Sequence, residues 1–578
     1  MRLRARWTLI LGLLATLVGA LVLVAAQPIR SPWWIYDNAD PSYTAAGLEL
    51  MAGLPIKFVD HPGLPITQLT GLAFGLDYLV EGAGRESRVD FANRSLLDLD
   101  STRPVYRAIA VVLYLLGAVA AFMVVARLFG DWAWGLAGAA AWFAAPGLAP
   151  LSIQSRPDVP LAALILLFAY LIARAARDRS TAHALGAAAV AGFCVMLKLH
   201  ALGLFVPLAL LVLLRPPTDG WWPAFRAEAA RFVRAHKRAL AATALVLASL
   251  VVVFNAERVP FTPTSDQLVA VGVPILVVAD CLLLGWLLRS PVPGVARRFA
   301  YAGAVGTAFL AGAALPVLLM LPEGLQAIVK IQDALLGRGI NEGASPASVP
   351  FSRLLEDDLE IAFVVFLFAG VAAIIGLLRR DVVPALWFSG AAVLGLMAQS
   401  RLGSVHYYIP AFMLAMVGLL WLISGAGRRR PWLLVWVLLA LIAYPSFRDR
   451  HATAAEAERL IEVAAPSLTA LGGRLTPGEV AFTPSGWPDE DTRYFELVHR
   501  YTFSGPTYPY RFLPGAPDAS ALATERGLRF RYYTGPAIFH VSGEADVELD
   551  GLGTYHVRRL PDVPLAVELL SGPGVAPG

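Results

Sequence analysis

Acidic residues and a histidine gather just past the first long apolar run of this chain. The stretch WWIYDNADPSYTAAGLELMAGLPIKFVDHPG, residues 33–63, carries Asp37, Asp40, Asp60 and His61. Asp37 follows a cluster of aromatic residues. A carboxyl group held among aromatic rings at a membrane surface binds a proton more readily than one in water, which suits a general base. We therefore interpret Asp37 as a candidate base, whereas His61 before a proline has the alternative role of closing a turn.

A second set of candidates is cationic and lies near the ends of later apolar runs. Its members are Arg156, Lys198, Arg401 and His406. Charged groups at such a depth are costly unless they are paired or solvated. Arg can hold a phosphate through two parallel hydrogen bonds and Lys as a point charge. Two interpretations stay open: a phosphate site, or structural groups, with Arg156 paired to Asp158 and the others reaching lipid headgroups.

The composition places both sets in a membrane protein. The chain has 578 residues, of which 57% are hydrophobic and 16% charged, and its mean hydropathy is +0.62. Apolar runs of roughly 20 residues, the length that crosses the hydrocarbon of a bilayer, recur along it. We expect about thirteen membrane-spanning helices. Their approximate ranges are 7–26, 105–128, 134–151, 157–175, 183–199, 200–215, 239–256, 267–288, 299–321, 361–378, 382–399, 405–424 and 431–447.

The charges of the short loops predict an orientation. With the N-terminus inside, alternate loops carry cations such as Arg127, Arg174 and Arg297, as the positive-inside rule requires. The acid-rich segments 27–104 and 322–360 then lie outside. The formal net charge of +4 reflects this loop bias rather than a surface for nucleic acid. We expect no nucleic-acid partner.

Two short helices are expected to position the acids of the first outer loop. Asp40 precedes a proline, which is a favoured helix start, and a Gly-Leu-Pro run supplies the matching end. This predicts a helix over about 41–52 with Tyr43 on its partly apolar face, and a second over about 64–80. Asp40 therefore also has a structural role, because its side chain would cap the first of these helices.

The first outer loop resembles that of the GT-C superfamily of membrane glycosyltransferases, closest to protein O-mannosyltransferases and the lipid A aminoarabinose transferase. In that branch the loop reads like D-E-x-x-Y followed by H-x-P-P-L. The matching residues here are Asp37, Tyr43 and the HPGLP run of His61–Pro65. This sequence has Asn38 in place of the second acid and Gly63 in place of the second proline.

Three later stretches extend the resemblance over roughly residues 1–425. QSRPDVPLAALILL, residues 154–167, resembles the R-P-D/E at the start of the fourth span in such enzymes. VMLKLHALGLFVPL, residues 195–208, is similar to their lysine-bearing stretch near the fifth span. SRLGSVHYYIPA, residues 400–411, resembles the late H-Y-x-x-P segment.

The resemblance implies an inverting glycosyltransferase whose donor is a sugar on a polyprenyl phosphate. Asp37 would take the proton of the acceptor hydroxyl. The expected acceptor-binding residues are Asp40, Tyr43 and His61, and the expected donor-phosphate ligands are Arg156, Lys198, Arg401 and His406. Asp37 and Asp40 suit a divalent cation such as Mg²⁺ or Mn²⁺, although no spacing demands a metal. Membrane lipid is an expected partner, and the acceptor is a glycan, a lipid or a protein.

The expected fold is a polytopic α-helical membrane protein with a GT-C-like core and a C-terminal α/β domain. Residues 1–447 would form the membrane part, in which 322–360 is a mobile outer loop, and residues 448–578 the outer domain. In that domain the alternating runs RFRYYTG, AIFHVSG, ADVELDG and TYHVRRL, separated by Gly turns, predict strands, and residues 454–471 predict a helix. High Ala, Arg and Gly content favours a bacterial source, hence the cytoplasmic membrane with the active site and the C-terminal domain facing outside. The alternatives are a transporter or flippase for lipid-linked saccharides, favoured by Asp280 within a span, and a polysaccharide polymerase or ligase.

Overall fold

Helices dominate the part of the chain that the structure describes. This computed structural model describes residues 2–27, 29, 40–54, 56, 63–97, 99–215, 221–255, 265–289, 293–335, 360–399, 405–424, 479–482, 545–549 and 553–559. The α-helices are α1 (Arg2–Ala25), α2 (Asp40–Met51), α3 (Leu64–Asp77), α4 (Arg88–Leu97), α5 (Leu99–Phe129), α6 (Trp132–Ala144), α7 (Asp158–Asp178), α8 (Thr181–Leu197), α9 (Phe205–Leu214), α10 (Trp221–Asn255), α11 (Ser265–Leu287), α12 (Pro293–Leu319), α13 (Leu321–Leu335), α15 (Glu360–Leu378), α16 (Val383–Gln399) and α17 (Val405–Ser424).

Shorter elements complete the description. They are the π-helix η2 (Tyr78–Gly82), the 3-10 helices η3 (Pro150–Ile153) and η4 (Leu199–Leu204), and the strands β1 (Glu479–Phe482), β2 (Ala545–Leu549) and β3 (Gly553–Arg559).

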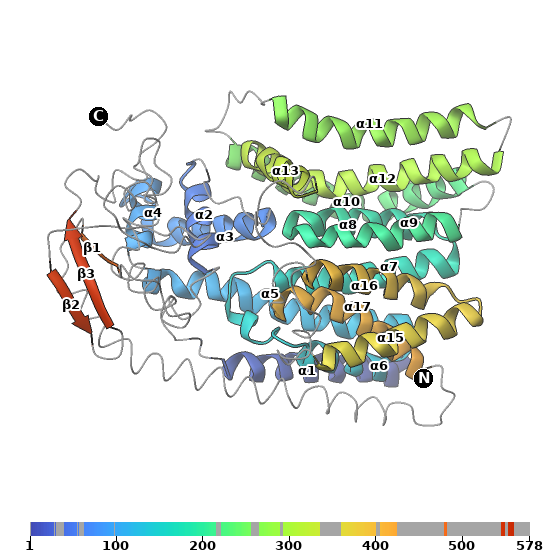
Figure 1. The fold of residues 1–578 in the computed structure, drawn as a ribbon, viewed down its shortest axis with the longest axis horizontal. Coiled ribbons are helices and arrows are strands. Elements are labelled where there is room, and N and C mark those ends of the chain that lie inside the picture. The colour runs from blue at the N-terminus through green and yellow to red at the C-terminus, as the bar shows by residue number, and fades with distance from the viewer. Residues whose placement is uncertain are drawn as a thin grey trace.

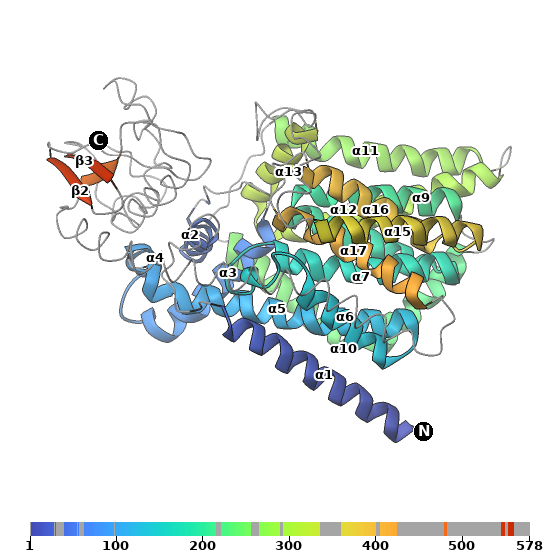
Figure 2. The same cartoon turned by 60° about the horizontal axis from the view of Figure 1, so that its bottom comes forward.

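The long helices run side by side in one bundle, and α2, α3 and α4 gather at one end of it (Figure 1). The N-terminus lies at the opposite end of the bundle, as the turned view in Figure 2 also shows. A shared apolar core joins α7, α8, α16 and α17. Within it the indole N–H of Trp387 donates to the carbonyl oxygen of Ala169 at 3.0 Å, which ties α16 to α7.

The helices follow the expected membrane spans. Each expected span from 7–26 to 405–424 overlaps a helix of the structure, and 431–447 lies outside the described residues. In the described part of the chain, four helices have the length and apolar composition to cross a membrane: Thr102–Phe129, Asp158–Asp178, Gly294–Leu319 and His406–Ser424. Shorter apolar helices accompany them. These helices support a multi-pass membrane protein. The expected number of about thirteen spans stays a prediction.

The two helices expected in the first outer loop are present as α2 and α3, with starts at Asp40 and Leu64. The end of α2 has the hydrogen bonds of a Schellman motif. The amide of Leu54 donates to the carbonyl oxygen of Glu49 at 2.8 Å, and the amide of Gly53 donates to that of Leu50 at 3.2 Å. Gly53 has a φ of 77°, a conformation that glycine adopts without steric cost.

One expectation for the outer loops needs correction. The segment 322–360 was expected to be a loop, but its first part is helix α13, and α15 begins at Glu360. The pattern explains the helix, because apolar residues recur at Leu321, Leu325 and Ile328 on one face. Residues 336–359 lie outside the described part of the chain.

The described C-terminal residues form a three-stranded antiparallel sheet in the order β1-β3-β2. β2 and β3 coincide with two of the stretches whose alternation predicts strands, ADVELDG and TYHVRRL. The other two, RFRYYTG and AIFHVSG, and the helix expected near 454–471 lie outside the described residues. A separate α/β domain over 448–578 remains a prediction.

Candidate active site

Arg156 and Lys198 both lie where a membrane helix is interrupted. α6 ends before Pro146, which disfavours helical backbone in the residue before it, and the chain then runs through η3 and an extended turn to reach Arg156. Lys198 has an extended backbone, with φ −156° and ψ 129°, between α8 and η4. These breaks bring two cationic side chains, far apart in sequence, to neighbouring helix ends.

Asp158, the first residue of α7, joins the two cations. Lys198 Nζ donates to Asp158 Oδ1 at 2.5 Å, and Arg156 Nε lies 3.4 Å from Asp158 Oδ2. The Asp158 side chain is 0% exposed. Each carboxylate oxygen thus faces a different cation. Two cations at this distance keep the buried carboxylate ionised, because opposite charges offset its loss of hydration.

α17 supplies the other side of the cluster. Arg156 Nη2 lies 3.0 Å from His406 Nε2. A guanidinium has no acceptor, so His406 accepts this hydrogen bond at Nε2 and carries no proton on that nitrogen. Lys198 Nζ lies 4.0 Å from the centre of the Tyr407 ring, a cation–π contact. Asp158, Arg156, Lys198, His406 and Tyr407 are called the charged cluster below.

The two cations differ in access. The Lys198 side chain is 4% exposed and enclosed by Asp158 and Tyr407, whereas the Arg156 side chain is 18% exposed. Arg156 has five N–H donors in a planar fork. The described contacts of its side chain are made by Nε and Nη2. A phosphate would therefore meet Arg156 and His406 first, with Lys198 behind them.

The first outer loop is bound to the residue that precedes Lys198. The amide of Gly63 donates to the carbonyl oxygen of Leu197 at 3.3 Å, next to Lys198. Gly63 has a φ of 55°, and an added Cβ there would lie 2.5 Å from Tyr43 Cε1. A proline at Gly63 would have no N–H and its φ is fixed near about −65°. The departure from the H-x-P-P-L pattern therefore has a structural reason in this chain.

A second contact, about two turns further along α3, joins this helix to the segment that carries Arg156. The hydroxyls of Thr70 and Ser155 lie 3.4 Å apart and are both buried. Ser155 directly precedes Arg156 in sequence. The loop that carries the candidate acids thus packs against both segments that carry the buried cations.

α12 and α13 hold the first outer loop from the other side. Gln68 Nε2 donates to the carbonyl oxygen of Pro316 at 2.6 Å. At the end of α12 the amide of Met320 donates to the carbonyl oxygen of Val317, three residues earlier, rather than to that of Pro316. The carbonyl oxygen of Pro316 accepts from Gln68 instead. Glu323 Oε1 accepts the amide of Ile56 at 3.1 Å, and both groups are buried. These contacts fix the chain on either side of residues 57–62.

Several expected site residues lie outside the described part of the chain. Asp37, His61 and Arg401 are outside it, and Asp40 begins α2 with a side chain that is outside it as well. The structure therefore brings together Arg156, Lys198 and His406. It places Tyr43 against Gly63, whose amide bonds the residue before Lys198. In the part of the chain described, no group of three or more His, Cys, Asp or Glu residues is arranged to hold a metal ion.

Sequence reasoning missed Arg107. This guanidinium in α5 is 1% exposed, and its Nη1 donates to the carbonyl oxygen of Ile29 at 2.5 Å. It thereby holds the chain that leaves α1 on its way to Asp37. The available signal was a charged residue inside the apolar run 105–128, because such residues are usually functional or paired.

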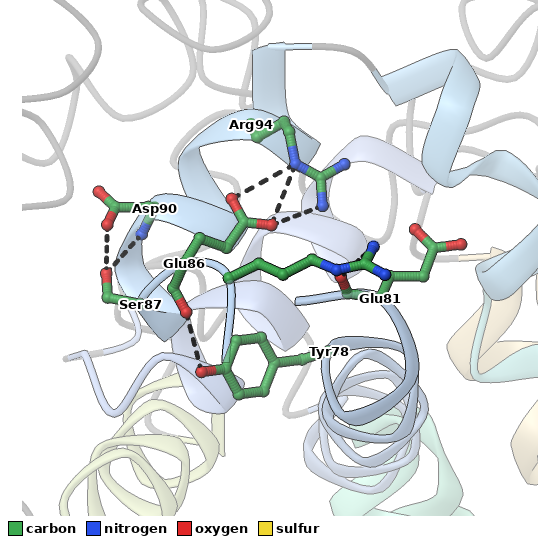
Figure 3. A network of polar contacts seen from close by, with 7 residues as sticks. Tyr78, Glu81, Glu86, Ser87, Asp90 and Arg94 are labelled. Carbon is green, nitrogen blue, oxygen red and sulfur yellow. Dashed lines mark hydrogen bonds and ion pairs between the residues drawn. The ribbon is translucent and has the colours of Figure 1, made fainter. Parts of the chain in front are cut away.

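The outer helices also carry an exposed polar network, drawn in Figure 3. Arg94 pairs with Glu86 at 2.7 Å, and the Tyr78 hydroxyl donates to the carbonyl oxygen of Glu86 at 3.1 Å. Ser87 caps α4 by accepting the amide of Asp90 at 3.1 Å while its hydroxyl donates to Asp90 Oδ2 at 2.6 Å. These bonds define the turn between η2 and α4 rather than a pocket.

A known protein family matches the segment that carries part of the candidate site. Residues 96–230 match the family described as dolichyl-phosphate-mannose-protein mannosyltransferase. This confirms the GT-C resemblance for a segment that includes Arg156, Asp158 and Lys198, whereas Asp37, His61 and His406 lie beyond its limits. No curated protein matches the chain.

Two solved structures are similar to this chain at low identity. They are ArnT from Cupriavidus metallidurans in the apo state, with 17% identity over 88% of this chain and 90% of that one, and the same protein bound to undecaprenyl phosphate, with 16% identity over 97% and 99%. Both have a TM-score of 0.28, which is too low to transfer geometry or function.

Proposed function

We propose that this protein is an inverting glycosyltransferase that moves a sugar from a polyprenyl-phosphate-linked donor to an acceptor hydroxyl. The observation that carries the proposal is the contact between Gly63 and Leu197. It joins the loop that carries the candidate acids to the charged cluster. A base for the acceptor and cations for the leaving phosphate are the two requirements of sugar transfer from a lipid phosphate.

In the proposed reaction the acceptor oxygen attacks the anomeric carbon as the bond from that carbon to the phosphate oxygen breaks. The polyprenyl phosphate leaves with the bonding electron pair, and Asp37 takes the acceptor proton. Arg156 and His406 face the departing phosphate, where a guanidinium stabilises the charge that develops. Asp40, Tyr43 and His61 are proposed to position the acceptor, and Arg401 to bind the phosphate. Attack opposite the phosphate inverts the configuration.

The proposed setting is the outer face of a bacterial cytoplasmic membrane. The donor lipid remains in the bilayer, so the reacting groups must lie at headgroup depth. The description of the family that residues 96–230 match names dolichyl-phosphate mannose. This supports a polyprenyl-phosphate sugar as the donor class. A divalent cation held by Asp37 and Asp40 would be the cofactor. Transfer measured after chelation and after addition of Mg²⁺ or Mn²⁺ tests that part separately.

The transporter alternative rested on Asp280. This residue lies on an exposed face of α11, away from the charged cluster, whereas a transport site is expected between helices near the middle of the membrane. A polymerase or ligase shares the donor and the reaction chemistry and differs in its acceptor. The enzyme is therefore the better-supported function.

The test separates donor binding from transfer. Arg156→Met is expected to weaken retention of a labelled polyprenyl-phosphate sugar, and Asp37→Asn to preserve retention but slow transfer by about 100-fold to 10,000-fold. Arg94→Met is the matched control, because Arg94 lies in the exposed network. Normal donor retention in Arg156→Met would show that the donor phosphate does not bind at this cluster. Normal transfer in Asp37→Asn would show that Asp37 is not the general base.

A further inference from the structure

The carboxylate of Asp158 makes no contact with the exposed side of the charged cluster, yet it fixes the charge of that cluster. Arg156 and Lys198 each carry one positive charge and Asp158 one negative charge. His406 accepts a hydrogen bond from Arg156 at Nε2. His200 lies nearby, with its ring centre 5.9 Å from that of Tyr407. Whatever charge the two imidazoles and Arg401 contribute, ionised Asp158 lowers the net positive charge of the site by one.

The phosphate changes its charge during the proposed reaction. The donor is a phosphodiester, which carries one negative charge. The product polyprenyl phosphate is a phosphomonoester, whose second ionisation near pH 6 gives it about 1.5 to 2 negative charges at pH 7. Each positive charge beside the phosphate stabilises the doubly charged product more than the singly charged donor. A site with one positive charge fewer therefore retains the product less strongly relative to the donor.

We propose that Asp158 is a specificity-determining residue that lowers the positive charge facing the phosphate by one and so disfavours retention of the doubly charged product. This inference rests on the proposed function, because it requires that Arg156 contacts the phosphate. Asp158 acts through its two cations. It is 0% exposed and contacts both of them, so it is a positioning residue rather than a group that touches the lipid.

The geometry explains how one carboxylate can control both cations. Oδ1 accepts a hydrogen bond from Lys198, and Oδ2 lies 3.4 Å from Arg156 Nε, so the charge of the carboxylate acts on both cations at short range. Lys198 is further held by the Tyr407 ring. The lysine therefore supplies charge at short range but no direct contact, and the arginine keeps its remaining donors for the substrate.

The test is a charge series on the full chain in detergent. Relative to wild type, Lys198→Met lowers the net charge of the cluster by one, Asp158→Asn raises it by one, and the double variant Asp158→Asn/Lys198→Met leaves it unchanged. The probes are farnesyl phosphate and its monomethyl ester, which have the same lipid tail and differ by about one charge at pH 7.5. The measured quantity is the ratio of their dissociation constants. A purely structural ion pair would change the unfolding midpoint without changing this ratio.

We expect the preference for farnesyl phosphate over its methyl ester to follow the charge series. Asp158→Asn should increase it by about tenfold to hundredfold, because an added charge a few ångströms away acts more strongly on the doubly charged group. Lys198→Met should decrease it by a similar factor, and the double variant should resemble wild type. If Asp158→Asn does not fold, the comparison of Lys198→Met with the double variant still isolates Asp158.

Two outcomes separate this inference from the proposed function. If Arg156→Met binds both probes as wild type does, the phosphate site lies elsewhere and the proposed function loses its main support. If Arg156→Met loses both probes but the ratio is constant across the charge series, the phosphate site stands and the role of Asp158 is overturned. Release of polyprenyl phosphate after one turnover should also be slower in Asp158→Asn than in the double variant.

Discussion

The charged cluster and the exposed network of α3 and α4 contain the same kinds of groups in different surroundings. In the cluster, Asp158 and Lys198 are 0% and 4% exposed. In the network, Arg94 and Glu86 are 51% and 21% exposed (Figure 3), although their contact is equally direct. Water and salt screen an exposed pair, so it contributes about 0–1 kcal/mol. A buried pair cannot lose one member without leaving a charge in a medium that solvates it poorly.

This difference separates two uses of ion pairs in one protein. The exposed network shapes a turn and tolerates change. The buried cluster keeps two cations within the helix bundle, where they would be too costly without Asp158. Substitutions should therefore have effects that fall steadily from the cluster, through the contacts that dock the loop on it, to the network.

The largest effect is expected at the start of α7. Asp158→Ala should lower the free energy of unfolding by about 3–5 kcal/mol, because Lys198 would stay buried without its carboxylate. The matched control is Asp178→Ala at the other end of the same helix, where Asp178 pairs with Arg174 at 2.8 Å and is 41% exposed. The control should cost less than about 1 kcal/mol. Chemical unfolding in detergent measures both, and equal losses would contradict the contrast between buried and exposed pairs.

The next largest effect is expected where the outer loop meets the cluster. Gly63→Ala should cost about 2–4 kcal/mol, since a left-handed backbone is unfavourable for alanine and the new Cβ would press on the buried Tyr43 ring. Transfer should fall as well. Gly84→Ala is the control, because Gly84 has a φ of 80° with nothing within 4 Å of an added Cβ. It pays the backbone cost alone, of about 1–2 kcal/mol. Equal losses of unfolding free energy at both glycines would show that the contact with Tyr43 adds nothing to the cost at Gly63.

A smaller effect is expected where α13 holds the loop. Glu323→Leu leaves the buried amide of Ile56 without this acceptor, which typically costs about 1–3 kcal/mol. Glu323→Gln keeps an acceptor oxygen and should recover most of the loss. Hydrogen exchange at the Ile56 amide and the unfolding free energy should change together in the leucine variant. Unaltered exchange there would rule out this hydrogen bond as an anchor of the loop.

The sequence predicts the elements better than the contacts between them. Apolar runs predict the spans, and an Asp-Pro step with a later glycine predicts α2 to within a residue at each end, because these signals are local. The same local logic missed α13, whose apolar spacing was read as part of a loop. The family motifs pointed to Arg156, Lys198 and His406, and these three are brought together in the structure.

The relative access of those cations could not be read from the sequence. Burial of Lys198 against Asp158 and Tyr407 depends on how α7, α8 and α17 pack, and helix packing leaves no local pattern in any one segment. The bond from Gly63 to Leu197 joins two backbones and has no side-chain signature either. Asp37, Asp40 and His61 keep their predicted roles as hypotheses for the experiments on transfer.

The smallest effect is expected at Asp77, beside the exposed network. Partial burial raises the pKa of the Asp77 carboxyl, and the negative charge of Glu81 adds to this, while Arg94 acts in the opposite direction. A raised pKa means that the folded protein favours protonated Asp77. The stabilising contribution of protonated Asp77 is complete below the ordinary pKa of 3.8. It is lost as the pH rises through the higher pKa of the folded protein.

Asp77→Asn should therefore be slightly more stable than wild type at pH 7, by a few tenths of a kcal/mol because the site is well solvated. The advantage should vanish at about pH 3, where both side chains are neutral. Unfolding of the two proteins compared at both pH values measures it, and a variant less stable than wild type at pH 7 would mean that the charge of Asp77 supports the turn between η2 and α4.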